Sequence, residues 1–320
     1  MIPAHIFGPV LSRRLGLSLG VDLIPFKTCS YDCAYCECGA TTVKTITRKA
    51  FFPPEDVIAE LCNMLASRPH LDSITLAGSG EPTLSSSLGH VIRFVKQEYP
   101  EYTLSVLTNG SLMTSVNVLE ELACADRVIP TLTSVFQETF EHIHRPHPSL
   151  RIEAIIAGMV KFREMYSGAI WLEVFVIPGL NTTAKELVGL KGMIEQINPD
   201  QVQLNTLDRP SAEGWVVPAT EAELERVSDL LGRSGIEIVG RKLLFSQATK
   251  TNTEAGDLVR ATLRRRPSTV EDLVRTTGLS GGEVAKILGV LERDVEVTSQ
   301  RGTRGVFYAI LPVKTGNGDT

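Results

Sequence analysis

The amino-acid sequence predicts an α/β fold: a partial barrel of six strand–helix units followed by a small winged-helix domain. Between residues 20 and 234, short apolar segments typical of strands alternate with longer amphipathic segments typical of helices. Polar or glycine-rich stretches follow five of the strand segments. The alternation of strand and helix segments ends near Phe245. Short strands that alternate with helices indicate a parallel sheet with right-handed crossovers.

The expected strands occupy residues 20–24, 73–77, 103–107, 127–132, 170–177 and 201–205. The expected helices occupy residues 54–67, 87–98, 115–123, 150–165, 184–197 and 221–234. Loops at 26–36, 78–83, 108–111, 178–181 and 206–210 all follow the C-terminal end of a strand. Active sites of strand–helix barrels form at that rim, so the five loops predict one shared site.

The domain organisation follows from the change near Phe245. Residues 1–245 are expected to form the barrel domain, and the polar segment 246–253 a linker. Residues 254–312 read as three short helices (254–265, 269–277 and 281–293) and a two-strand ribbon (295–298 and 306–311). Three helices and a ribbon are typical of the winged-helix arrangement. Residues 313–320 are expected to be a disordered tail.

Composition narrows the class of protein. Hydrophobic residues make up 43% and charged residues 22% of the 320 residues, which is ordinary for a globular protein. The formal net charge of −5 gives no general attraction to nucleic acid or to an anionic membrane. The chain shows neither a signal-peptide pattern nor the roughly 20 apolar residues of a membrane helix. A cytoplasmic protein without a membrane partner is expected.

Four of the six cysteines fall within ten positions: Cys29, Cys33, Cys36 and Cys38. In a reducing compartment such clustering indicates a metal site, since disulfides are rare there. Three thiolates from Cys29, Cys33 and Cys36 would leave one iron of a four-iron cluster without a protein ligand. The alternative is a structural zinc loop with Cys38 as the fourth ligand. Cys62 and Cys124 lie in helical patterns and are expected to be small buried hydrophobic residues.

The spacing of Cys29, Cys33 and Cys36, with Tyr35 before the third cysteine, resembles the radical SAM superfamily. Gly78-Ser79-Gly80-Glu81-Pro82, after the second expected strand, resembles the loop with which this family binds the methionine part of S-adenosylmethionine (SAM). Thr108-Asn109-Gly110 also matches the family pattern, and Thr131 keeps the hydroxyl of a Ser-Leu-Asp motif whose aspartate is missing here.

The resemblance implies a [4Fe–4S] cluster held by the three cysteines and SAM bound at the open iron. It implies that Tyr35 packs near the adenine and that Glu81 faces the SAM ammonium group. The remaining cofactor-binding residues that it implies are Gly78, Ser79, Gly80, Thr108, Asn109 and Thr131. The activity implied is reductive cleavage of SAM to a 5′-deoxyadenosyl radical, which needs a one-electron donor such as a flavodoxin or ferredoxin.

A narrower resemblance, to a wyosine-synthase-like branch, is based on residues 8–16, 19–29, 144–148 and 203–210. Wyosine synthases carry a second cluster on cysteines upstream of the first motif, and no cysteine precedes Cys29. The resemblance therefore implies the branch but not that reaction. The candidate substrate contacts are basic or amide side chains: Arg13, Arg14, Lys27, His144, Arg145, His147, Asn205 and Arg209.

Three functions are consistent with the sequence. The first is a radical SAM enzyme that acts on RNA or a related nucleotide. The second is a radical SAM enzyme that modifies a peptide or protein held by the winged helix. The third is a non-enzymatic iron–sulfur or zinc regulator that binds DNA. Residues 251–311 hold nine basic and eight acidic side chains, so DNA is not the favoured partner of this segment.

Overall fold

The computed structural model describes residues 5–232, 234–240 and 255–311, and the chain divides into two compact units. The first contains residues 1–207 and 211–245, and the second contains residues 208–210 and 246–320. The expected linker at 246–253 and tail at 313–320 lie outside the described residues. Each unit has its own hydrophobic core.

The first unit is built on an eight-stranded sheet in the order β1-β2-β5-β6-β7-β8-β9-β10. Only β1 is antiparallel to its neighbour; the strands from β2 to β10 run parallel. The strands are β1 (Ile6–Ser12), β2 (Gly16–Val21), β5 (Ser73–Leu76), β6 (Leu104–Thr108), β7 (Arg127–Pro130), β8 (Ala169–Phe175), β9 (Gln201–Asn205) and β10 (Ile236–Ile238). The predicted α/β class with a mostly parallel sheet is confirmed.

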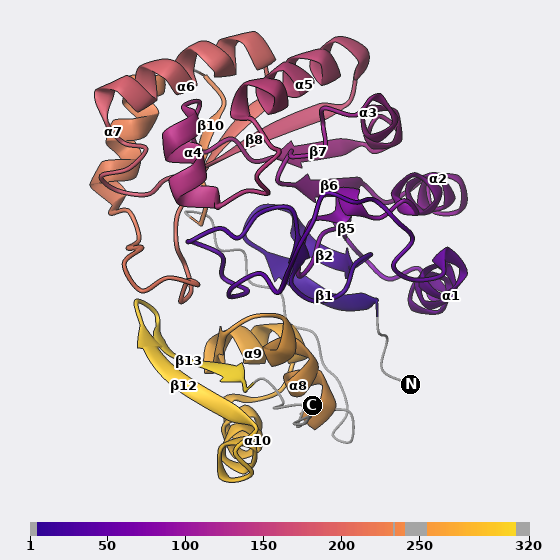
Figure 1. Ribbon diagram of the computed structural model, residues 1–320. Coiled ribbons are helices and arrows are strands. Elements are labelled where there is room, and N and C mark those ends of the chain that lie inside the picture. The colour runs from indigo at the N-terminus through magenta and orange to yellow at the C-terminus, as the bar shows by residue number, and fades with distance from the viewer. Residues whose placement is uncertain (1–4, 233, 241–254, 312–320) are drawn as a thin grey trace, which may run out of the picture. The chain divides into compact units, whose positions relative to one another are not determined.

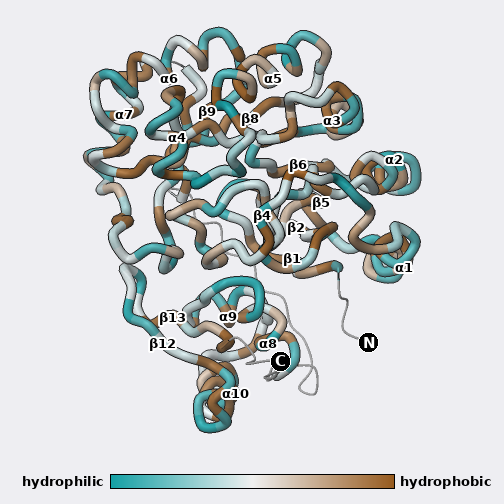
Figure 2. Tube along the Cα trace, viewed as in Figure 1, coloured by the Kyte–Doolittle hydropathy of each residue, from teal (hydrophilic) through white to brown (hydrophobic). Residues whose placement is uncertain are grey.

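Helices cover the outer side of this curved sheet (Figure 1). They are α1 (Pro54–Leu65), α2 (Leu88–Glu98), α3 (Val116–Leu122), α5 (Ile152–Met165), α6 (Ala184–Ile197) and α7 (Glu221–Leu231). Hydrophobic and hydrophilic segments alternate along these helices (Figure 2), as expected where one face packs on a sheet. A capping box formed by Thr220 and Glu223 fixes the start of α7, and Gly232 in a left-handed conformation ends it.

The two faces of the sheet differ in chemistry because side chains alternate along each strand. One face carries apolar residues such as Leu19, Ile74 and Leu172, which belong to the same buried core as helix residues. The opposite face is polar: Ser18 bonds Thr75 (Oγ to Oγ1, 2.6 Å), and further along it lie the residues described below. The barrel therefore has an apolar outside under the helices and a polar interior.

Several elements were not predicted from the sequence, among them β1, β10 and the helix α4 (Gln137–His144). β1 contains Gly8-Pro9, a pair that normally disfavours a strand, but a register shift between Phe7 and Val10 accommodates it at the edge of the sheet. β10 is only three residues long. The eight-residue helix α4 lacks a side-chain cap at its start, so the usual sequence signal is missing.

The second unit contains α8 (Ala255–Arg265), β11 (Ser268–Thr269), α9 (Val270–Thr277), α10 (Gly281–Arg293), β12 (Val297–Gly302) and β13 (Gly305–Ile310). Its strands form an antiparallel sheet in the order β11-β13-β12. Val259, Leu273 and Leu288 are buried in its core. The winged-helix designation remains a prediction. In the described residues, no helix is both long and apolar enough to cross a membrane.

We predict that Leu190→Ala lowers the free energy of unfolding of the barrel unit by about 2–5 kcal/mol, because a buried leucine leaves a cavity. Leu190, on α6, is 1% exposed. The matched control on the same helix is Val188→Ala, whose side chain is 73% exposed and whose loss is expected to change stability by less than about 0.5 kcal/mol. Urea unfolding measures both, and equal effects would contradict the packing of α6.

Candidate functional site

The cysteine motif lies on an irregular loop that follows β2. Its first cysteine is in the short strand β3 (Thr28–Cys29), which pairs with β4 (Val43–Lys44). Cys33 and Cys36 follow without regular secondary structure. All three thiols are half-buried and free of disulfides.

Backbone hydrogen bonds hold this loop against the end of α4 and the segment after it. The amide of Asp32 donates to the His144 carbonyl (2.9 Å), and the amide of Ala34 donates to the Ile143 carbonyl (2.9 Å). The amide of His147 donates to the Ser30 carbonyl (2.8 Å). An irregular loop needs such partners for its buried backbone groups. A helix that the sequence did not reveal thus holds the predicted metal-binding loop.

Basic and amide groups approach the sulfur atoms. Lys27 Nζ lies 3.0 Å from Cys36 Sγ, and Asn109 Nδ2 lies 3.5 Å from Cys29 Sγ. Burial lowers the pKa of Lys27, but the neighbouring cysteines, Cys36 foremost, outweigh this effect and raise the pKa above its usual value. Lys27 therefore stays a cation among the thiols and contacts the cysteine loop. The sequence left two roles open for Lys27, a substrate contact and a positive charge next to the cluster, and this position favours the second.

The thiols differ in their electrostatic environment. The hydrogen bond from Cys38 and the charge of Lys27 lower the pKa of the Cys36 thiol to about 6. Burial and the Glu81 carboxylate raise the pKa of the Cys29 thiol to about 12. Burial likewise raises the pKa of the Cys33 thiol well above its usual value. Cys38 thus acts on Cys36 as a hydrogen-bond donor, a contact that the sequence did not specify.

His144 and Tyr35 lie beside Cys33. His144 was expected in a rim loop but is the last residue of α4 and only 2% exposed, and its Nδ1 is 3.2 Å from Cys33 Sγ. Burial lowers the pKa of His144 to about 3, so its ring is neutral at physiological pH. Tyr35 stacks on Phe175 of β8 with ring centroids 4.0 Å apart. One face of the predicted adenine-contacting ring is therefore occupied by Phe175.

Glu81 joins the loops after β5 and β6. Its carboxylate accepts hydrogen bonds from Thr83 (amide, 3.0 Å; hydroxyl, 2.6 Å), from the Thr108 hydroxyl (2.6 Å) and from the Asn109 amide (2.7 Å). The side chain is buried. These donors give the Glu81 carboxylate a structural role, because they tie two loops of the rim to one side chain. Its contact with the SAM ammonium stays a prediction.

The glycines of the same loop allow it to approach the cysteine strand. A Cβ atom on Gly80 would lie 1.9 Å from the carbonyl oxygen of Thr28, and one on Gly78 would lie 2.3 Å from the carboxylate of Asp22. That carboxylate accepts hydrogen bonds from the amide (3.1 Å) and hydroxyl (2.7 Å) of Ser79. The glycines are therefore needed for packing against the chain itself, and their contact with the cofactor stays a prediction.

Glu173, which the sequence analysis did not name, contacts three residues that it named as candidate binding residues. Glu173 of β8 accepts hydrogen bonds from Arg14 Nη1 (2.6 Å), Thr131 Oγ1 (2.7 Å) and Asn205 Nδ2 (2.9 Å). Burial alone would raise the pKa of Glu173, but Arg14 and the two hydrogen-bond donors outweigh it and lower the pKa. Glu173 is the one charged residue of the otherwise apolar strand Ala169–Phe175, and this is the sequence signal that could have identified it.

Other predicted residues lie elsewhere. Arg209 belongs to the second unit, where its guanidinium donates to Asp272 (2.5 Å) and is buried. Arg209 is therefore part of an internal ion pair, and its contact with substrate stays a prediction. Arg145 pairs with Glu213 (2.6 Å). Cys62 and Cys124 were expected to be buried, but both are only half-buried.

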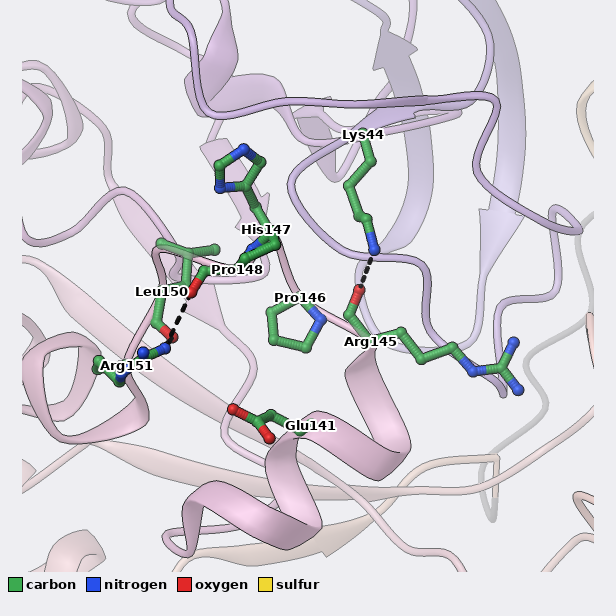
Figure 3. A pocket seen from close by; sticks show the side chains of 8 residues that line it. All are labelled: Lys44, Glu141, Arg145, Pro146, His147, Pro148, Leu150 and Arg151. Carbon is green, nitrogen blue, oxygen red and sulfur yellow. Dashed lines mark hydrogen bonds between the residues drawn. The ribbon is translucent and has the colours of Figure 1, made fainter.

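A surface pocket of about 350 Å³ lies beside the segment after α4 (Figure 3). Lys44 reaches across it to the Arg145 carbonyl (3.1 Å), and Arg151 Nη1 donates to the Pro148 and Leu150 carbonyls (2.9 Å each). His147, predicted as a substrate contact, lines this pocket. Arg145 extends its side chain away from His147.

The residues around the thiols suit an iron–sulfur cluster. Thiolates are its usual ligands, and hydrogen bonds to sulfur tune such centres; Lys27 and Asn109 already point such donors at sulfur atoms. Among the described residues, no three His, Cys, Asp or Glu side chains are arranged to hold a single metal ion.

Comparison with known proteins decides the family. The family model described as "Radical SAM superfamily" matches residues 23–189, more than half of the chain. The chain belongs to the radical SAM superfamily. It is therefore a radical SAM enzyme, and its cofactors are a [4Fe–4S] cluster and SAM, as predicted. The alternatives of a structural zinc loop and of a non-enzymatic regulator are set aside by this result.

Two relatives extend the likeness beyond the matched segment. A UPF0026 protein of Helicobacter pylori is 35% identical over 84% of this chain and 87% of its own length. A protein of Brachyspira hyodysenteriae named GTPase Obg is 32% identical over 96% of this chain. The chain spans only 45% of that protein's length. The likeness thus extends over most of the chain, although neither relative's name refers to a radical reaction.

Solved structures support the fold alone. The structure of Streptococcus suis SuiB bound to precursor peptide SuiA matches 69% of this chain and 48% of SuiB, with a TM-score of 0.54. Sequence identity is 13%. A radical SAM methyltransferase from Sphaerobacter thermophilus gives a TM-score of 0.53 at 17% identity.

We predict that Glu81→Gln destabilises the enzyme by about 1–3 kcal/mol, because the amide nitrogen of Gln faces donors that need an acceptor. The matched control is Glu195→Gln, since Glu195 is exposed on α6. Thermal unfolding of the two variants provides the comparison. Equal stability of Glu81→Gln and wild type would contradict the role of Glu81 in joining the rim loops.

Proposed function

We propose that Cys29, Cys33 and Cys36 hold the cluster and that the enzyme cleaves SAM reductively to act on RNA or a related nucleotide. The observation that carries the site assignment is the set of three thiols on one loop, two of them contacted by Lys27 and Asn109. When bound, the cluster and SAM supply the electron and the 5′-deoxyadenosyl group for hydrogen abstraction.

The protein's own side chains bind and orient the cofactors. Lys27 offsets negative charge next to Cys36, and neutral His144 packs between Cys33 and the aromatic rings of Tyr35 and Tyr31. Thr108 and Asn109 are fixed by Glu81 at the edge of the cysteine loop. Gly78, Ser79 and Gly80 bring a second loop to the same edge. We assign SAM binding to this edge, where hydrogen-bonding groups are already positioned.

The RNA assignment is supported by the wyosine-synthase-like motifs alone. A second candidate function is the modification of a peptide. It is favoured by the likeness of fold to SuiB, whose crystal structure contains its bound precursor peptide. In that case the second unit would dock the peptide as a winged helix. Radical SAM enzymes need an electron donor, and we propose a flavodoxin or ferredoxin. RNA or a peptide that co-purifies with the enzyme separates the two candidates.

We predict that Cys33→Ala loses most of its iron after anaerobic reconstitution and forms no 5′-deoxyadenosine from SAM with dithionite. Two remaining thiolates cannot hold the cluster firmly. The matched control is Cys38→Ala on the same loop, which is expected to retain iron and SAM cleavage. Iron analysis and chromatography of the products provide the measurements. Full iron content in Cys33→Ala, or its loss in Cys38→Ala, would overturn the ligand assignment.

A further inference from the structure

A row of polar side chains crosses the inner face of the sheet. Thr131 is bridged to Glu173, and in register with Glu173 lies Gln203 of β9, which in turn is in register with Glu237 of β10. Residues in register on neighbouring parallel strands point to the same face. These groups therefore face the polar interior of the barrel, away from the helices.

Arg14 crosses the interior to reach this row. It lies in the turn between β1 and β2, at one edge of the sheet, and pairs with Glu173 of β8 at 2.6 Å. The side chains remain 16% and 13% exposed, so solvent or a ligand can reach the pair. Arg13 also acts on Glu173 electrostatically.

Arg14 and Gln203 each have side-chain groups that could form further hydrogen bonds. A guanidinium has five N–H donors, and within the described part of the chain Arg14 uses its side chain in a bond only through Nη1. Gln203, which is completely buried, has no partner for its Oε1 among the described residues. Gln203 Oε1 is closed off within the protein, so the spare cationic donors of Arg14, which is 16% exposed, are the groups here that a ligand can reach.

The row lies next to the cysteine loop. Phe175 is two residues beyond Glu173 on the same face of β8, and its ring stacks on Tyr35 at 4.0 Å. Asn205, in register with Phe175, also donates to Glu173. A molecule bound to Arg14 would therefore extend toward Tyr35 and the thiol of Cys33.

We propose that Arg14, positioned by Glu173, binds an anionic group of the substrate inside the barrel. The substrate class is thus a carboxylate or phosphate. Arg suits such a site because its planar fork pairs with both anions through two bonds. This inference names the substrate class for the proposed function and rests on it.

The test is calorimetric titration of the SAM-saturated, reconstituted enzyme with inorganic phosphate and with malonate. Arg14→Gln is expected to weaken binding of the preferred anion at least tenfold. Glu173→Gln is expected to strengthen it severalfold, because the competing carboxylate is gone while Arg14 keeps its charge. A purely structural ion pair predicts weakening in both variants. Preference for phosphate would indicate a phosphorylated substrate, and preference for malonate a carboxylic acid.

Two further variants serve as controls for the titration. Arg68→Gln removes an arginine that is 63% exposed and is expected to leave anion affinity within twofold of wild type. The double variant Arg14→Gln/Glu173→Gln leaves neither charge unpaired, and it is expected to fold and bind as weakly as Arg14→Gln. Equal affinity in wild type and either Arg14 variant would overturn the proposal.

Iron content and SAM cleavage are measured on the same samples. If the wild-type enzyme holds no iron or cleaves no SAM, the proposed function is contradicted. The anion site consists of protein side chains alone, so the titration still decides whether it exists.

Discussion

The backbone hydrogen bonds between the cysteine loop and the chain around the end of α4 are the constraint on which the site depends. Asp32 and Ala34 donate to the carbonyls of His144 and Ile143, and Ser30 accepts from His147. Without these partners, an irregular loop could not keep three thiols half-buried on one side of the barrel. The same contacts bring His144 to Cys33 and Tyr35, so one set of bonds fixes both the ligands and their surroundings.

Two buried carboxylates act in a similar way within the barrel. Glu81 joins the loops after β5 and β6, and Glu173 joins the β1–β2 turn, Thr131 just after β7, and β9. Each accepts from at least three donors, which offsets the cost of burying a charge. The polar interior is thereby kept in one arrangement, while the apolar outer face of the sheet packs against the helices and supplies the stability.

The sequence predicted most of what depends on local pattern. The bounds of β9 and α6 match the expected segments, and the cysteine spacing by itself indicated the family. The features that were missed depend on distant partners. The role of Glu173 arises only when Arg14, 159 positions away, pairs with it. The hydrogen bonds of Glu81 were missed because the donors on Thr108 and Asn109 become its neighbours only in the folded chain.

The central claim is that three thiols leave one iron open to SAM. Mössbauer spectroscopy of the ⁵⁷Fe-reconstituted enzyme, recorded with and without SAM, tests it most directly. We predict that one iron site of the cluster changes its isomer shift when SAM is added, while the others keep theirs. Four iron sites that stay unchanged by saturating SAM would contradict it, because all of them would then have permanent protein ligands.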